Sequence, residues 1–88
     1  MLAVTGAEYL DGYRIRLSFS DGTTGVVDLT DALWGPVFEP LRERGAFRRF
    51  EVSPVFHTVC WENGGDLAPE YLHDLMLEQA AAQPRAIA

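Results

Sequence analysis

The sequence of 88 residues predicts a small α+β fold: a three-stranded antiparallel meander and a second hairpin, with short helices and one C-terminal helix packed on the sheet. Residues 13–19 alternate strictly between apolar and polar side chains, as in a half-buried strand. Asp-Gly dipeptides at 11–12 and 21–22 flank that run and favour tight turns. Pro69 precedes apolar residues at helical spacing, which predicts the final helix.

Loop length predicts the register of the meander, whose strands are expected near residues 2–10, 13–19 and 23–29. A three-residue loop over 20–22, with Gly22 left-handed, places apolar residues opposite apolar ones, whereas a two-residue turn mixes them on every rung. The same loop length over 10–12 completes the expected pairs: Ile15–Val27, Tyr13–Leu29, Arg14–Asp28, Tyr9–Tyr13, Ala7–Ile15 and Glu8–Arg14. Arg14 is then expected between two carboxylates on the outer face.

The middle of the chain predicts short elements. A helical turn over 31–34 is expected, capped by Thr30 or Asp28 and stopped by the Gly-Pro pair at 35–36. A second short helix over 39–44 should end at Gly45, and one more turn is plausible over 46–50. A hairpin with strands near 50–53 and 56–62 follows, joined through a turn at 53–55 because Pro54 lacks a backbone donor.

The final helix is expected over 69–82. Proline suits its first position, and Glu70 next to it suits the positive end of the helix dipole. Leu72, Leu75 and Met76 lie on one side at helical spacing and form the expected docking face. The whole chain is expected to form one compact domain over residues 1–83, followed by a frayed tail over 84–88.

Charge and composition exclude several classes of function. The net charge is −6, from thirteen acids against seven arginines, and no lysine occurs. Because an acidic surface repels phosphates, we expect no direct nucleic-acid binding and instead a small basic protein partner. The single cysteine rules out an internal disulfide. With no signal peptide and no apolar run long enough to span a membrane, a cytoplasmic location is expected.

No residues point strongly to catalysis. His57 and Cys60 are three apart on a predicted strand, so their side chains should leave opposite faces, out of hydrogen-bond reach. His73 has carboxylates near it, but a metal site usually needs three or four convergent ligands. Asp66 and Glu70 resemble helix-capping groups more than an acid–base pair. We therefore expect no catalytic residues, no metal and no cofactor.

Three acids on the final helix carry the best functional signal. Glu70, Asp74 and Glu78 recur every four residues and stack on one helix face with no basic residue between them. This row is either a plain solvated face or a surface for a basic partner protein. Both interpretations remain open at the level of sequence.

Residues 61–70 form a junction of strand, glycine turn and helix. The glycines suit a positive-φ turn, Asp66 can accept hydrogen bonds from the free amides of the helix, and Pro69 opens it. A structural role is therefore expected for six residues of this segment: Trp61, Asn63, Gly64, Asp66, Pro69 and Glu70.

The same segment carries a resemblance to a known family. Residues 19–23, 27–29, 35–41, 47, 59–70 and 72 together resemble the bacterial domain-of-unknown-function family 2442, over roughly residues 3–77. The resemblance implies an α+β fold with a small antiparallel sheet and no catalytic residues. Members are often encoded beside a small protein of another uncharacterised family, in a toxin–antitoxin-like arrangement.

The leading hypothesis is a non-enzymatic interaction module, the acidic partner in such a gene pair. The alternative is a small-ligand-binding or minor enzymatic domain that uses a groove near Trp61 and His57.

Overall fold

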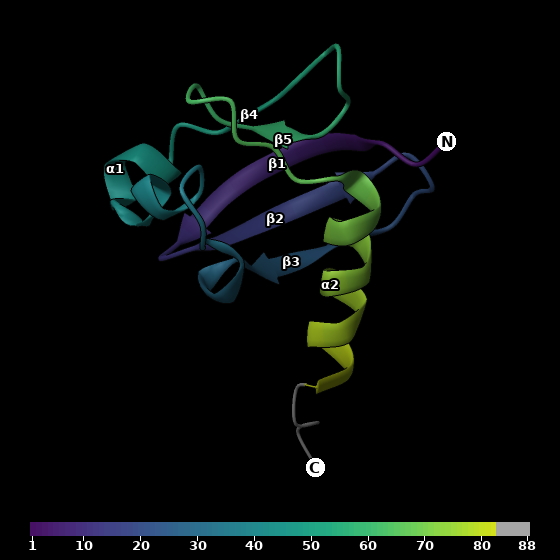
Figure 1. The fold of residues 1–88 in the computed structure, drawn as a ribbon. Helices are drawn as coiled ribbons and strands as arrows, with labels where there is room; N and C mark the ends of the chain where they lie inside the picture. The colour runs from purple at the N-terminus through teal and green to yellow at the C-terminus, as the bar shows by residue number, and fades with distance from the viewer. Residues whose placement is uncertain (83–88) are drawn as a thin grey trace.

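The computed structural model describes residues 1–82 and confirms the α+β class. The elements in chain order are the strands β1 (Val4–Asp11), β2 (Arg14–Phe19) and β3 (Thr24–Asp28), the 3-10 helices η1 (Thr30–Ala32) and η2 (Glu39–Arg42), α1 (Arg44–Phe47), β4 (Glu51–Val52), β5 (Val59–Cys60) and α2 (Pro69–Ala82). The first three strands form a sheet in the order β1-β2-β3, and β4 and β5 form a separate hairpin that lies alongside β1. Helix α2 packs against β3, and α1 lies at the opposite end of the sheet (Figure 1). The predicted tail over 84–88 lies outside the described residues.

The second turn of the meander follows the prediction. Ile15 faces Val27 and Arg14 faces Asp28. Phe19 and Thr23 close the loop over 20–22 with a backbone hydrogen bond of 2.9 Å, and Gly22 is left-handed at φ +89°. The alternation of apolar residues was therefore enough to select this register.

The first hairpin differs from the prediction. Tyr9 faces Ile15 and Glu8 faces Arg16, two residues away from the expected pairing. The chain turns at residues 12–13, with Gly12 at φ +49°, and an irregularity between Tyr9 and Asp11 absorbs the extra residue. A shift of two residues keeps residues 6–9 on their expected faces, so the polar pattern could not distinguish the two registers.

The outer-face ion pairs change with that register. Arg14 lies 3.0 Å from Asp11, and Arg16 lies 2.8 Å from Glu8. Arg14 is therefore not placed between Glu8 and Asp28, although Asp28 still faces it across the sheet. All four side chains in the two pairs are well exposed, so each pair contributes only about 0.2–1 kcal/mol.

The short helices are placed slightly differently from the prediction. The turn after β3 is η1, and the Asp28 carboxylate accepts a hydrogen bond of 2.9 Å from the amide of Thr30. Gly45 does not end a helix but lies inside α1, because Glu43 caps α1 and accepts bonds of 2.9 Å from the amides of Gly45 and Ala46. These amide bonds hold the pKa of Glu43 below its usual range. A glycine next to an arginine-rich run is thus a poor helix-stop signal when a carboxylate precedes it by two residues.

The second hairpin is much shorter than expected. Its strands have two residues each, and residues 53–58 form the connection. The Ser53 hydroxyl accepts bonds from the amides of Val55 and Phe56, which organises this connection around Pro54. His57 belongs to it and has φ +56°, so it does not lie in a strand.

The core lies between the inner face of the meander, α2 and the middle segment. Its buried apolar residues come from nearly every element: Val4, Ile15, Leu17, Phe19, Val27, Leu29, Ala32, Leu33, Leu41, Phe47, Val59, Trp61, Leu72 and Met76. Helix α2 begins and ends as predicted, and it buries Leu72 and Met76, with Leu75 packed beside them. Gln79, one turn further, holds the amide and the carbonyl of Asp28 at 2.8 Å each. The side-chain amide of Gln79 therefore satisfies the backbone amide and carbonyl of Asp28 at the free edge of β3.

Substituting Gly25 is expected to disturb the contact between β3 and α2. A Cβ at this position would lie 2.6 Å from Sδ and 2.9 Å from Cγ of Met76, which is 5% exposed. We expect Gly25→Ala to lower the free energy of unfolding by about 1–3 kcal/mol in urea titration. Gly6→Ala is the matched control, because its Cβ would meet Ser18 at an ordinary 3.8 Å. Equal stability of the two variants would contradict this close approach.

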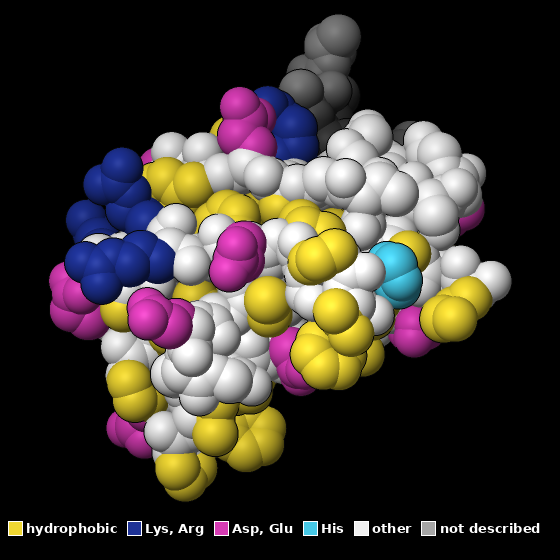
Figure 2. All heavy atoms as spheres, turned by 90° about the horizontal axis from the view of Figure 1, so that it is seen from above, with side chains coloured by type: hydrophobic (Ala, Val, Ile, Leu, Met, Phe, Trp, Pro, Cys, Tyr) yellow, Lys and Arg dark blue, Asp and Glu magenta, His cyan; other side chains and the backbone are white. Residues whose placement is uncertain are grey.

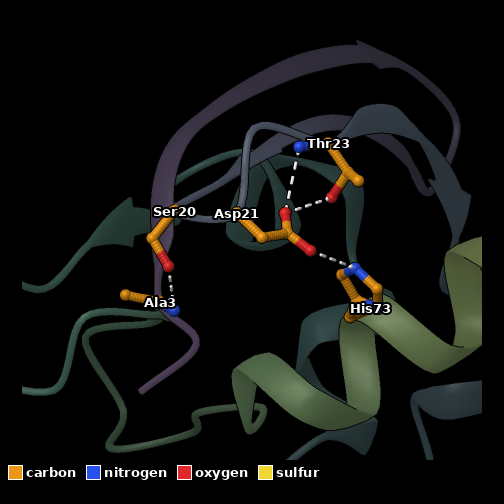
Figure 3. Close-up of polar contacts among 5 residues, drawn as sticks. All are labelled: Ala3, Ser20, Asp21, Thr23 and His73. Atoms are coloured by element: carbon orange, nitrogen blue, oxygen red, sulfur yellow. Dashed lines mark hydrogen bonds and ion pairs between the residues drawn. The ribbon is translucent and has the colours of Figure 1, made fainter.

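Asp21 connects the loop before β3 to helix α2 (Figure 3). One carboxylate oxygen accepts bonds from the Thr23 hydroxyl at 2.6 Å and the Thr23 amide at 3.0 Å, and the other lies 3.0 Å from Nε2 of His73. The His73 ring also meets Phe19 edge to face, with 4.9 Å between centroids. The two hydrogen bonds from Thr23 are the main reason that the pKa of Asp21 lies below its usual range, and His73 lowers it further.

This lowered pKa predicts a pH dependence of stability. The ionised carboxylate contributes fully above the unfolded-state pKa of about 3.9, and its contribution is lost as the pH falls through the lower folded-state pKa. The difference in Tm between the wild type and Asp21→Asn should therefore narrow as the pH is lowered from about 5 to 2. Asp31→Asn is the control, since Asp31 is exposed and no other described residue bonds to its side chain. A difference that stays constant over this range would count against the role of the ionised form.

Candidate functional site

The segment over residues 61–70 is built by its own hydrogen bonds. The buried Trp61 donates from Nε1 to the carbonyl of Phe47 at 2.9 Å. Its amide bonds the carbonyl of Gly65 at 2.8 Å, and its carbonyl accepts from Gly64 at 3.0 Å. Gly64 has φ +91°, which only glycine adopts without strain. The segment thus closes a tight loop directly after β5.

Asn63 fastens this loop to the middle of the chain. Its side-chain amide donates to the carbonyl of Val37 at 2.8 Å, and its Oδ1 accepts from the amide of Gly65 at 3.1 Å. Asp66 was expected to accept bonds from the free amides of α2, but no such bond occurs within residues 1–82. Its backbone instead pairs with Cys60 as an isolated bridge, and its side chain is exposed. Pro69 and Glu70 open α2 as predicted.

Cys60 and His57 do not form a nucleophile and base. Burial raises the pKa of the Cys60 thiol, and the carboxylates of Glu51 and Asp66 raise it further. A thiol in such surroundings stays protonated and is a weak nucleophile. His57 is exposed in the connection between β4 and β5 and makes no side-chain hydrogen bond to another described residue.

The described residues were also compared with the requirements for a metal site and for a membrane-spanning helix. Over residues 1–82, no group of three or more His, Cys, Asp or Glu side chains is arranged to hold a metal ion. None of the helices in that range combines the length and the apolar character needed to cross a bilayer.

The cleft beside Trp61 does not include His57, which the sequence had placed with it. An open cleft of about 260 Å³ does adjoin Trp61, but its other lining residues are Pro40, Leu41, Ala46, Arg49, Glu62 and Asn63. His57 also lines neither of two further clefts, one beside Trp34 and Tyr71 and one beside Gly25 and Met76. Trp61 itself is 4% exposed and donates its only polar hydrogen to Phe47, so it offers a ligand little surface.

A second open cleft, which we call the aromatic cleft, has more exposed walls. It measures about 300 Å³ and is lined by Ala32, Trp34, Phe38, Asp66, Leu67, Ala68 and Tyr71. Trp34 and Tyr71 are 72% and 44% exposed, so two large aromatic residues from different parts of the chain meet at one surface cleft. Neither residue was singled out from the sequence. The signal available in the sequence was Trp34, an aromatic residue that precedes the Gly-Pro pair at 35–36 and lies outside the alternating pattern of the strands.

The predicted row of acids lies beside this cleft on the exposed side of α2. Glu70, Asp74 and Glu78 are all exposed, and none forms an ion pair with another described residue. Glu70 directly precedes Tyr71, and Asp74 lies one turn further along the helix. We call these three residues the acidic row.

Arginines concentrate at the end of the molecule that holds α1, with acids beside them (Figure 2), and the net charge of the chain conceals this. Four of the seven arginines fall within residues 42–49, and basic side chains gather at the end of the molecule that holds α1 (Figure 2). Arg42 is occupied, since it donates to the carbonyls of Leu33 and Thr30 at 2.8 and 3.0 Å. We call the other three, Arg44, Arg48 and Arg49, the arginine cluster. They form no ion pair with another described residue, although Arg48 lies 5.0 Å above the ring of Tyr9.

The comparison with solved structures corrects one prediction. The chain is similar to the crystal structure of "putative DNA binding protein NE0471" from Nitrosomonas europaea, with a TM-score of 0.80 and 27% identity. The match covers 92% of this chain and 52% of that chain, so this chain spans about half the length of that protein. The prediction that nucleic-acid binding is excluded is contradicted by this likeness. It relied on net charge, which averages an acidic helix and a basic end into one number.

The remaining comparisons concern the family. The search of curated proteins returned no match. The model of the family described as "Protein of unknown function (DUF2442)" matches residues 4–76, which is most of the chain. These residues include the whole meander, the aromatic cleft, the loop closed by Trp61 and the first half of α2. The chain therefore belongs to the DUF2442 family.

Proposed function

We propose that this chain is a non-enzymatic protein-interaction domain that binds a basic partner through the exposed side of α2. The acidic row is the observation that carries the proposal. Stacked carboxylates repel one another by a few tenths of a kcal/mol per pair, and a basic partner would relieve that cost. The three acids that do form ion pairs among the described residues, Glu8, Asp11 and Asp21, all lie outside α2.

The partner that fits this proposal is a small basic protein encoded by the adjacent gene, in a toxin–antitoxin-like pair. Reversing the charge of Asp74 and Glu78 together, as Asp74→Lys/Glu78→Lys, should weaken the complex with that gene's product by at least about tenfold. Both side chains are exposed, so the substitutions leave the buried face of α2 untouched. Isothermal titration calorimetry at two salt concentrations measures the effect.

Glu51→Lys/Glu62→Lys is the matched control, because it changes the net charge by the same amount at two exposed acids away from α2. Similar weakening in both double variants would mean that only net charge matters. If neither the wild type nor the variants bind the adjacent gene's product, the proposed pairing is wrong.

Direct contact with DNA through the arginine cluster is a second candidate function, favoured by the likeness to NE0471. The three guanidinium groups lie on one short segment, 44–49, and form no ion pair with a described carboxylate, although Arg49 attracts the carboxylate of Glu43. Each arginine–phosphate contact adds about 0.9 to the slope of log K against log salt. Changing all three residues to glutamine should therefore reduce that slope by about 2–3 in fluorescence anisotropy with a DNA duplex. Arg14→Gln/Arg16→Gln is the control; an equal loss there, or no binding by the wild type, would dismiss this candidate.

A further inference from the structure

The aromatic cleft joins an apolar surface to an acidic rim. We propose that it is the socket for one large apolar side chain on a partner segment that carries lysine or arginine on either side of that anchor. This inference rests on the proposed function, since it assigns the place where the basic partner is anchored. It adds an apolar anchor to what the acidic row alone could provide.

The walls and floor of the cleft are suited to an apolar group. Trp34 exposes most of its surface to solvent and Tyr71 nearly half. Phe38 and Leu67 are half-buried and pack against the core. Exposed tryptophan and tyrosine side chains beside a pocket are typical of residues that dominate binding energy at interfaces. A volume of about 300 Å³, open to solvent, is at the lower end of small-molecule sites and is better filled by a side chain.

The loop that carries Trp34 is held in place before any partner binds. Arg42 donates to the carbonyls of Leu33 and Thr30, and the amide of Trp34 bonds the carbonyl of Ala32 at 3.1 Å. Gly35 directly after it has φ +87°, which sets the turn. A wall fixed in this way loses little conformational freedom on binding, so more of the burial energy appears as affinity.

Charge complementarity specifies the occupant. Asp66 lines the cleft, Asp31 and Glu39 adjoin its lining residues in sequence, and Glu70 and Asp74 follow on α2. No arginine lines it. Basic residues beside the anchor would therefore meet Asp66 in the cleft and the exposed acids of α2 next to Tyr71. A nucleic acid would be repelled by the same groups, and two copies meeting through this face by two-fold symmetry would oppose their acids.

Labelled synthetic peptides test this directly. One peptide has a central leucine between lysines, the second has alanine in place of that leucine, and the third keeps leucine but has glutamates for lysines. Fluorescence anisotropy with the full chain measures their affinities. Burial of a leucine side chain is worth about 1.5–3 kcal/mol, so we expect the first peptide to bind roughly tenfold to a hundredfold more tightly than the second. The acidic peptide should not bind.

Surface variants locate the binding site. Trp34→Ala and Tyr71→Ala should each abolish the preference for leucine over alanine, whereas Phe56→Ala should retain it. Phe56 is the matched control because it is 65% exposed in the connection between β4 and β5. The basic leucine peptide should also shift the emission of the wild type to shorter wavelength, since Trp34 is exposed and Trp61 is already buried.

The outcomes separate this inference from the proposed function. The two basic peptides could bind equally well, and their binding could be lost in Asp74→Lys/Glu78→Lys. That result would refute the apolar anchor and leave the acidic row as the surface that binds the partner. Absence of binding by both basic peptides would also overturn the anchor, while the complex with the adjacent gene's product tests the proposed function independently. Sedimentation of the chain alone provides a further check. A dimer that Trp34→Ala dissociates would mean that a second copy of the chain occupies the cleft, and it would overturn the proposal of a basic partner segment.

Discussion

Replacing Trp61 by alanine is expected to lower the free energy of unfolding by about 3–5 kcal/mol, most of the stability of a chain of this size. The indole is 4% exposed, stacks near Phe47 with 5.8 Å between centroids, and donates a hydrogen bond to the carbonyl of that residue. Its removal therefore opens a large cavity and leaves a buried carbonyl without its donor. Urea titration followed by circular dichroism measures the loss.

Trp61→Phe separates the two contributions of the indole. Phenylalanine keeps most of the apolar volume but cannot donate to Phe47, so we expect a smaller loss of about 1–3 kcal/mol. If Trp61→Ala and Trp61→Phe were both as stable as the wild type, residues 61–70 would not have the structural role assigned to them here. Their polar groups would then need a functional explanation.

Replacing Phe47 by alanine is expected to have an effect of similar size, about 3–5 kcal/mol. Phe47 is fully buried, and it meets the rings of Tyr9, Tyr13, Phe50 and Trp61 with centroids between 5.2 and 6.2 Å. It is thus the centre of an aromatic cluster that joins α1 to the first hairpin and to the loop after β5. The midpoint in urea measures the loss.

Phe56→Ala is the control for this substitution, since an exposed phenylalanine should cost less than about 0.5 kcal/mol. Because Phe47 and Trp61 are in contact, the double variant should cost less than the sum of the single ones. Additive losses would show that the two rings contribute independently, against the description of one cluster.

The sequence predicted those parts of the fold that a periodic pattern dictates. The α+β class, the bounds of α2 and the pairing of Ile15 with Val27 followed from apolar periodicity and from the glycine in the loop over 20–22. The first hairpin was wrong by two residues, since that shift preserves both faces of the strand. Gly45 was misassigned as a helix end because the cap formed by Glu43 depends on local geometry that composition does not reveal.

The candidate site was less predictable. The acidic row could be found from its spacing of four residues, because helical periodicity fixes which side chains share a face. The aromatic cleft could not, since it brings Trp34 from the middle segment against Tyr71 from α2, and no local pattern joins them. The arginines of the cluster were visible in the sequence, but the prediction used only the overall charge of −6.

Mapping amide chemical shifts in the complex with the adjacent gene's product tests most directly whether this domain acts through the acidic side of α2. At 9.8 kDa the chain is well suited to a residue-by-residue comparison of free and bound spectra. We predict that the large changes fall within residues 32–38 and 66–78, with residues 44–49 unaffected. Changes centred on the arginine cluster, or around His57 and Cys60, would contradict the account.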